Sequence, residues 1–332
     1  MGVVLNGFAL VLFLLARATP SLPPDCLPGT TAVSRIARRK TEPFRDLTTE
    51  FQPQSPATCD EVLELMYRQG LAPRLVSHAV SRNNSRCCQF KVPNIVHYIY
   101  FGKTTRICFR QYLSFLGVHK FIRPDCVFVH GDGLFVEAWW VRTLIDVPNI
   151  YVVRRPRLTA IHGQPIGWIQ HASDFLRLQV LYDFGGIYLD NDVLVVASFD
   201  PLRNYDFTLD VEETRALANG VIVSRRGAPF LRVWLESYRA YQPQVWVGNS
   251  VYVPYTIASI LPHLIHIENK TMVHPTYKQL DLLYRTHYDW SNNYCIHLYE
   301  WRSHRLPKSH RELKYARGTA AEVMRYIYSA GA

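Results

Sequence analysis

Several signatures of common protein classes are missing from this chain of 332 residues. Its seven cysteines lack the C-x-x-C spacing that is typical of structural zinc sites. The net charge of +10 comes without a long basic run, because Lys and Arg are scattered and the densest cluster, RIARRK (residues 35–40), reads as a solvated stretch. There is also no internal repeat. A nucleic-acid-binding role is therefore not predicted, and the charge indicates a preference for anionic ligands such as phosphates.

Long apolar runs are scarce as well. The one at the amino terminus, Val3–Ala16, has about fourteen residues, which is short for a membrane span and typical of the apolar part of a signal peptide. Ala16-Arg17-Ala18 fits a small-x-small cleavage site. We predict a signal peptide or a short signal-anchor over residues 1–18. Either one sends the chain into the secretory pathway, to the Golgi lumen or to secretion, and an uncleaved segment would be its only membrane association.

The cysteines and two glycosylation triplets agree with that compartment. In an oxidising lumen, an odd number of cysteines predicts disulfides with at least one thiol left over, and the sequence does not fix their pairing. The cysteines are residues 26, 59, 87, 88, 108, 126 and 295. Asn83-Asn84-Ser85 and Asn269-Lys270-Thr271 are acceptor triplets for glycosylation of a lumenal chain.

The rest of the chain divides into a linker and one α/β domain. Residues 19–57 are rich in Pro, Ser and Thr without a sustained period, which predicts a stem. Residues 58–332 form the predicted domain, with its core at 92–300. Strand-like and helix-like patterns alternate there, which favours a mainly parallel sheet between helices. Strands are expected at 94–102, 126–131, 150–153, 217–226 and 293–301, and helices within 59–79, 106–116, 136–145, 173–184 and 229–241.

The stretch LYDFGGIYLDNDVLVV (residues 181–196) contains the strongest candidate site. Asp190 and Asp192 stand between two apolar, strand-forming runs, where a buried carboxylate is costly unless it is neutralised. As positions i and i+2 of a strand, they would face the same side. Two converging carboxylates attract a hard cation such as Mn²⁺ or Mg²⁺, which completes its shell with phosphate and water. A solvated surface turn is the alternative for any D-x-D triplet.

Three other residues are candidates by position. Asp174 and Arg177 are three residues apart, so they share one face of the helix that leads to the aspartates, with Ser173 as its expected N-cap. An ordinary helical ion pair is the alternative for them. His297 lies on a late strand, where a lone histidine is more often a packed core residue than a metal ligand.

The block HASDFLRLQVLYDFGGIYLDNDV, preceded by IVHYIYFG and followed by NGVIVSRRGAPFLRVWLESY, resembles the D-x-D sugar transferases of glycosyltransferase family 32. The resemblance covers about residues 92–300. It implies a GT-A (Rossmann-like) fold, a nucleotide-sugar donor, Mn²⁺ or Mg²⁺, and retention at the anomeric carbon. The family includes α-1,6-mannosyl-, α-1,4-galactosyl- and α-1,4-N-acetylglucosaminyltransferases and, more distantly, clostridial toxin glucosyltransferases.

The resemblance also implies roles for single residues. Asp190, Asp192 and His297 would hold the metal, and Asp190 would also contact the donor. Asp174 and Arg177 would bind the transferred sugar and the donor phosphate, as catalytic and donor-binding residues. His97 and Tyr98 would lie beside the base of the donor. Asn219 would face the sugar or the acceptor.

The function expected from these residues is transfer of a hexose or N-acetylhexosamine to a glycan, glycolipid or glycoprotein. UDP-galactose, UDP-N-acetylglucosamine, UDP-glucose and GDP-mannose are the candidate donors, distinguished by loops 154–170 and 242–256. A haloacid-dehalogenase-type phosphatase also has a D-x-D strand, but it requires Thr or Val where Leu194 stands. The second open alternative is a lumenal sugar-binding protein that has the same fold and has lost catalysis.

Overall fold

The computed structural model describes residues 58–81, 89–102, 104–300 and 306–330. The predicted signal segment and stem (1–57) lie outside the described residues, as do Cys26, Cys87, Cys88 and Asn83. Among the described helices, none combines the length and the apolar character needed to cross a membrane. Asn269, in the second glycosylation triplet, is exposed.

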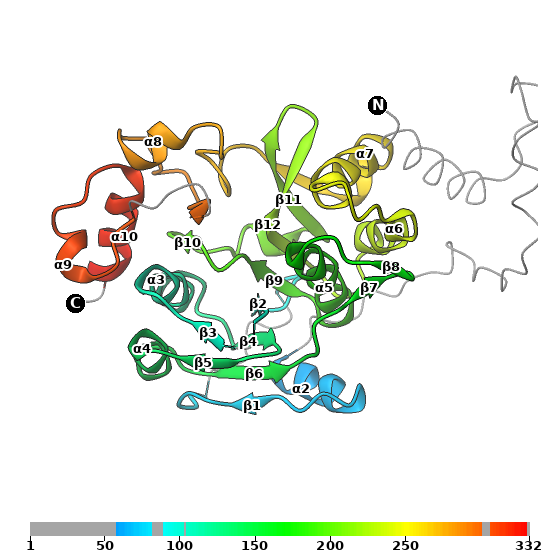
Figure 1. Ribbon diagram of the computed structural model, residues 1–332, viewed down its shortest axis with the longest axis horizontal. Helices are drawn as coiled ribbons and strands as arrows, with labels where there is room; N and C mark the ends of the chain where they lie inside the picture. The colour runs from blue at the N-terminus through cyan, green and yellow to red at the C-terminus, as the bar shows by residue number, and fades with distance from the viewer. Residues whose placement is uncertain (1–57, 82–88, 103, 301–305, 331–332) are drawn as a thin grey trace, which may run out of the picture. The chain divides into compact units, whose positions relative to one another are not determined.

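An eight-stranded sheet forms the centre of the fold, in the order β1-β6-β4-β2-β9-β12-β11-β13 (Figure 1). Its four middle strands β6, β4, β2 and β9 are parallel, as is the pair β11 and β13, whereas β12 is antiparallel to both its neighbours. The strands are β1 (Arg74–Leu75), β2 (Ile95–Tyr100), β4 (Cys126–Gly131), β6 (Ile150–Arg154), β9 (Gly186–Leu189), β11 (Phe207–Glu213), β12 (Ala216–Ser224) and β13 (His266–Glu268).

The apolar character of the middle strands explains their place. Every residue of β2 (IVHYIY), β4 (CVFVHG) and β9 (GIYL) is buried, as expected for parallel strands that are covered on both faces. The predicted α/β class, with a mainly parallel sheet between helices, is confirmed. The predicted strands at 126–131 and 150–153 agree with β4 and β6 to within one residue.

Helices flank the sheet on both sides. In Figure 1, α5, α6 and α7 pack together on one side, and α3 and α10 lie on the other. The helices are α2 (Cys59–Arg68), α3 (Phe109–Gly117), α4 (Ala138–Asp146), α5 (Ile169–Phe184), α6 (Pro229–Ser237), α7 (Val253–Ile260), α8 (Leu280–Tyr284), α9 (His310–Leu313) and α10 (Thr319–Ser329).

One predicted helix start was wrong. Helix α5 begins at Ile169, with Trp168 in extended conformation as its N-cap, and not after Ser173. Ser173 instead lies within the helix, where its hydroxyl accepts a hydrogen bond from Arg177 Nη2 at 3.2 Å. The earlier start brings Trp168 to the edge of the helix, and the helix ends at Gly185, whose φ of +69° favours glycine.

A short antiparallel pair joins two distant parts of the chain. Strand β10 (Val193–Val195) pairs with β14 (Cys295–His297), with Val193 opposite His297. Both strands pack into an apolar cluster with α3 and α10. The pairing therefore places His297 next to the D-x-D residues, which precede it by more than a hundred positions.

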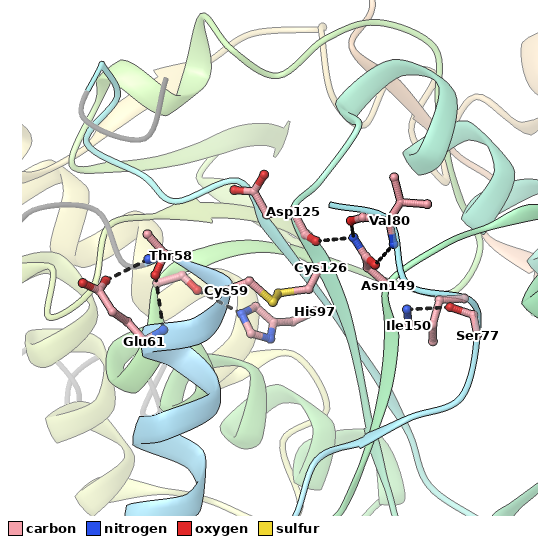
Figure 2. Close-up of a disulfide and its surroundings, with 11 residues drawn as sticks. Thr58, Cys59, Glu61, Ser77, Val80, His97, Asp125, Cys126, Asn149 and Ile150 are labelled. Atoms are coloured by element: carbon pink, nitrogen blue, oxygen red, sulfur yellow. Dashed lines mark hydrogen bonds between the residues drawn. A yellow bond between two sulfur atoms is a disulfide. The ribbon is translucent and has the colours of Figure 1, made fainter. Parts of the chain in front are cut away.

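A disulfide joins Cys59, at the start of α2, to Cys126, at the start of β4 (Figure 2). Thr58 and Glu61 cap the same helix end reciprocally, since each side chain accepts a hydrogen bond from the other residue's backbone N–H. The predicted disulfide bonding is confirmed for this pair. Cys108 and Cys295 are free thiols within the described part of the chain.

Replacing Cys59 and Cys126 together by serine is expected to lower the free energy of unfolding by about 2–4 kcal/mol, because the bond closes a loop of 67 residues. Thermal unfolding of the wild type and the double variant measures the loss. A Cys108→Ser variant, which removes a free thiol, is the control and should unfold like the wild type. Equal melting temperatures for the wild type and the double variant would contradict a formed disulfide.

Candidate active site

A cavity of about 850 Å³ opens at the carboxyl ends of β2 and β9, where ligands bind in open α/β sheets. Ile99 of β2 and the turn after β9 contribute to its wall, together with residues of α5, β11, β12 and β14. The polar residues on the wall include Asp174, Arg177, Asp190, Asp192, Glu212, Asn219 and His297.

In Asp190 and in Asp192, one carboxylate oxygen accepts a hydrogen bond from the protein and the other lies toward His297. The hydroxyl of Tyr188 donates to Asp190 Oδ1 at 2.6 Å, and the backbone N–H of Glu300 donates to Asp192 Oδ2 at 2.9 Å. The remaining oxygens, Asp190 Oδ2 and Asp192 Oδ1, lie 4.0 and 3.1 Å from His297 Nε2. The two carboxylates and the imidazole therefore converge on one point.

This convergence fits a divalent metal. Ligand atoms of Asp190, Asp192 and His297 all lie within 4.8 Å of one another. Carboxylate oxygens suit Mn²⁺ and Mg²⁺, and an imidazole ligand favours the transition metal of the two. Burial lowers the pKa of His297, but Asp192 and Asp190 outweigh it and raise that pKa to about 9. The field that favours an imidazolium here also favours a bound cation.

Gly220, on β12, leaves the space in which the three groups meet. Its backbone carbonyl accepts from the N–H of Asp190 at 2.8 Å. A Cβ at this position would lie 2.9 Å from His297 Cε1, closer than real Cβ contacts, and 3.0 Å from Asp190 Oδ2, which is tighter than nearly all of them. Any larger residue would therefore fill the centre of the cluster.

Arg177 links the cluster to Asp174 and Asn219 on the cavity wall. Its guanidinium lies 3.3 Å from Asp190 Oδ1 and 3.1 Å from Asp174 Oδ1, and it donates to the backbone carbonyl of Asn219 at 2.8 Å. The side-chain amide of Asn219 donates to Asp174 Oδ1 at 2.9 Å. Burial raises the pKa of Asp174, whereas Arg177 lowers it. The buried Arg177 thus orients Asp174 and Asp190 through nitrogens that these contacts already occupy.

The carboxyl group of Glu212, on β11, also faces this cavity. The hydroxyl of Tyr299 donates to Glu212 Oε1 at 2.9 Å, and the ring of Tyr299 stacks on His297 with centroids 4.1 Å apart. Burial raises the pKa of Glu212, with His297 lowering it. The stacking restrains the imidazole, whose Nδ1 is buried with no hydrogen-bond partner among the described residues.

Most of the predicted site residues meet here, but two do not. His97 and Tyr98 are fully buried in β2 and are not part of the cavity wall. His97 bonds to His130 and to the carbonyl of Gly185, and burial lowers its pKa to about 3. The hydroxyl of Tyr98 shares a hydrogen bond with Ser114 at 2.9 Å. Both side chains belong to the core, and their expected place beside the base stays a prediction.

The convergence of the two aspartates also has another cause than the one expected. They do not alternate along a strand, since β9 ends at Leu189 and β10 begins at Val193. They stand in the turn between these strands, which the N–H of Val193 closes by donating to the carbonyl of Asp190 at 3.1 Å. Sequence reasoning missed Glu212, Gly220 and Tyr188. The alternating pattern of Phe207–Glu213 is the signal that could have revealed the strand carrying Glu212.

Comparison with known proteins agrees with the motif. Residues 143–208 match the glycosyltransferase sugar-binding region containing a DXD motif. Glucan organizing enzyme 1 of Cryptococcus neoformans var. grubii is 30% identical over 193 residues, 53% of this chain and 52% of that protein. Human alpha-1,4-N-acetylglucosaminyltransferase is 32% identical over 83 residues, 25% of this chain and 23% of the relative. The match thus spans about half the length of the first relative and a quarter of the second.

Among solved structures, the glycosyltransferase GlyE of Streptococcus pneumoniae covers 71% of this chain and 60% of its own, with a TM-score of 0.43 and 11% identity. PaToxG glycosyltransferase covers 60% of this chain and 74% of its own, with a TM-score of 0.37 and 17% identity. The GT-A class expected from the sequence agrees with the matched region and with the parallel sheet that carries the motif. The sequence of residues 143–208 is thus similar to the DXD-containing sugar-binding region of glycosyltransferases, in agreement with the resemblance noted from the motif.

Proposed function

We propose that this chain is a metal-dependent, retaining glycosyltransferase that moves a hexose or N-acetylhexosamine from a nucleotide sugar to a glycan, glycolipid or glycoprotein. The observation that carries the proposal is the convergence of Asp190, Asp192 and His297 on one point of the cavity wall. The neighbouring set of Asp174, Arg177 and Asn219 lines the same cavity and would supply polar groups to the transferred sugar. No nucleic-acid partner is proposed.

The metal would be held by Asp190 Oδ2, Asp192 Oδ1 and a ring nitrogen of His297. Bound there, a divalent ion supplies Lewis-acid stabilisation to the diphosphate leaving group. Tyr188 and the N–H of Glu300 keep the two carboxylates turned toward that point. Arg177 holds Asp174 and Asp190 in place through its ion pairs, so that the sugar hydroxyls would meet fixed acceptors. Direct contact of Arg177 with the donor phosphate stays a prediction.

The proposed reaction proceeds by front-face attack. An acceptor hydroxyl oxygen forms the new bond to the anomeric carbon, while the bond from that carbon to the diphosphate oxygen breaks and its electron pair leaves with the phosphate. The hydroxyl proton passes to the departing phosphate. Among the carboxyl groups of the cavity, the buried Glu212 most resembles a general base or nucleophile. The hydrogen bond that it accepts from Tyr299 holds it on the wall beside His297.

The secretory pathway, most simply the Golgi lumen, is the proposed location. The Cys59–Cys126 disulfide supports an oxidising compartment, and the exposed Asn269 is open to glycosylation there. The apolar segment at residues 3–16 supports entry into that pathway.

Donor hydrolysis across UDP-galactose, UDP-N-acetylglucosamine, UDP-glucose and GDP-mannose tests the proposal. The full-length chain is assayed with Mn²⁺, with Mg²⁺ and with EDTA. Turnover of one donor that depends on the metal would support the transferase and identify the sugar. Binding of a donor without turnover and without metal dependence would favour the sugar-binding protein that has lost catalysis.

A further inference from the structure

Two partly exposed tryptophan rings pack against each other, and one of them, Trp246, lines the cavity. Trp168 and Trp246 are 39% and 43% exposed, and their rings meet edge to face with centroids 5.3 Å apart at 88°. Trp246 lines the cavity together with Tyr252, which is 41% exposed. Large apolar side chains left exposed at a cavity mark a binding surface more often than a solvated one.

The rings are held in place by a buried histidine. The Nε2 of His171 donates to the backbone carbonyl of Trp246 at 2.9 Å, so its Nδ1 accepts from the hydroxyl of Tyr241 at 2.6 Å. That hydroxyl also accepts from the N–H of Gly167 at 3.2 Å. A Cβ at Gly167 would lie 2.1 Å from the carbonyl oxygen of Pro243, so only glycine allows the two segments to meet. The surface is therefore organised before any ligand arrives.

The rings also have a defined place along the cavity. Arg177 contacts both Asp190, at the metal cluster, and Asp174. Asp174 and Trp246 in turn line both the main cavity and a small side recess. Contacts thus lead from the metal cluster through Arg177 to Asp174, and Asp174 shares the side recess with Trp246. With the diphosphate at the cluster and the transferred sugar at Asp174, the next position outward is the one from which an acceptor reaches the anomeric carbon.

We propose that Trp168, Trp246 and Tyr252 form the acceptor subsite, and that its ligand is the pyranose ring of a saccharide. This inference rests on the proposed function and specifies its acceptor. A pyranose has an apolar C–H face and a rim of hydroxyls. The indole and phenol rings take the apolar face, since flat amphipathic rings bury large area at little entropic cost. Gln170, Ser173 and Ser250 line the same cavity and supply partners for the hydroxyls.

The test compares the full-length wild type with Trp246→Ala, Tyr252→Ala and Trp246→Phe. Donor hydrolysis without acceptor and transfer to methyl glycosides and free disaccharides of galactose, glucose, mannose and N-acetylglucosamine are measured side by side. The alanine variants should raise the KM for the saccharide about tenfold relative to the KM for the donor. Trp246→Phe, which keeps a ring, should recover most of that loss. Tyr315→Ala is the control, because Tyr315 is 76% exposed and lies outside the cavity.

Three results would overturn the inference. Equal rises in the donor and saccharide KM values would assign the rings to the donor sugar. If the sugar is transferred to a peptide or a fatty alcohol, and Trp246→Ala does not change that transfer, the ligand of the subsite is not a saccharide. Donor hydrolysis without transfer to any saccharide of the panel would count against it as well. Absence of hydrolysis for every donor would instead contradict the proposed function, so the two failures are distinguishable.

Discussion

Replacing Asp192 by asparagine is expected to lower metal-dependent donor turnover by about 10³-fold or more. The backbone N–H of Glu300 already donates to Asp192 Oδ2. In the variant this N–H would select the amide oxygen and turn the amide NH₂ group toward His297 and Asp190. A donor group would then occupy the position of a metal ligand, so the cation would be repelled as well as deprived of one oxygen.

Steady-state hydrolysis of the preferred donor, with Mn²⁺ in excess, measures this effect. The variant keeps the Glu300 hydrogen bond, so its melting temperature should stay near that of the wild type. Asp281→Asn is the matched control, because that aspartate is exposed in a helical ion pair with Arg285 and lies outside the cavity. Turnover of Asp192→Asn within a few-fold of the wild type would show that this carboxylate does not hold the metal.

Replacing Gly220 by alanine is expected to weaken the affinity for Mn²⁺ by about a hundredfold, although no ligand is changed. The added methyl group would lie 2.9 Å from His297 Cε1 and 3.0 Å from Asp190 Oδ2. Both groups belong to the cluster, so relief of the clash separates the ligands. The backbone of Gly220 has no positive φ that would strain an alanine, and the effect should therefore fall on the site rather than on folding.

Calorimetric titration with Mn²⁺ in the presence of UDP measures the affinity of this variant. Gly163→Ala is the control that distinguishes the effect of filling the metal site from the effect of backbone strain. Gly163 has a φ of +80° and open space around its Cβ position, so alanine there costs stability without touching the cluster. The account requires weakened metal binding in Gly220→Ala and unchanged binding in Gly163→Ala. Equal affinities in both variants would mean that the metal lies elsewhere.

Local patterns in the sequence were sufficient for the elements that build the site. The apolar runs of β2, β4 and β9 predicted buried strands, and the Gly-Gly pair after α5 predicted the end of that helix. The D-x-D triplet, together with the family resemblance, pointed to the segment that carries Asp190 and Asp192, but not to its turn conformation. These features depend on neighbours close in sequence, where periodicity and turn chemistry decide the conformation.

The rest depends on contacts between distant segments. His297 meets the aspartates because β14 pairs with β10, and nothing in the periodicity of either strand specifies that pairing. The importance of Gly220 arises from what its missing Cβ would touch. His97 has the composition of a site residue, but its hydrogen bonds to His130 and Gly185 satisfy it inside the core. Ser173 is a residue type that often caps a helix, but α5 begins before it, at Ile169, because the residues that precede Ser173 are helical too.

The central claim is that Asp190, Asp192 and His297 hold a divalent ion that in turn binds a nucleoside diphosphate. Electron paramagnetic resonance of free Mn²⁺, recorded with the full-length chain with and without UDP or GDP, tests it most directly. The account predicts that ~1 Mn²⁺ is bound per chain, more tightly with the matching nucleotide, and that Asp192→Asn abolishes the binding. An unchanged signal of free Mn²⁺ in the presence of chain and nucleotide, or equal binding by Asp192→Asn, would contradict it.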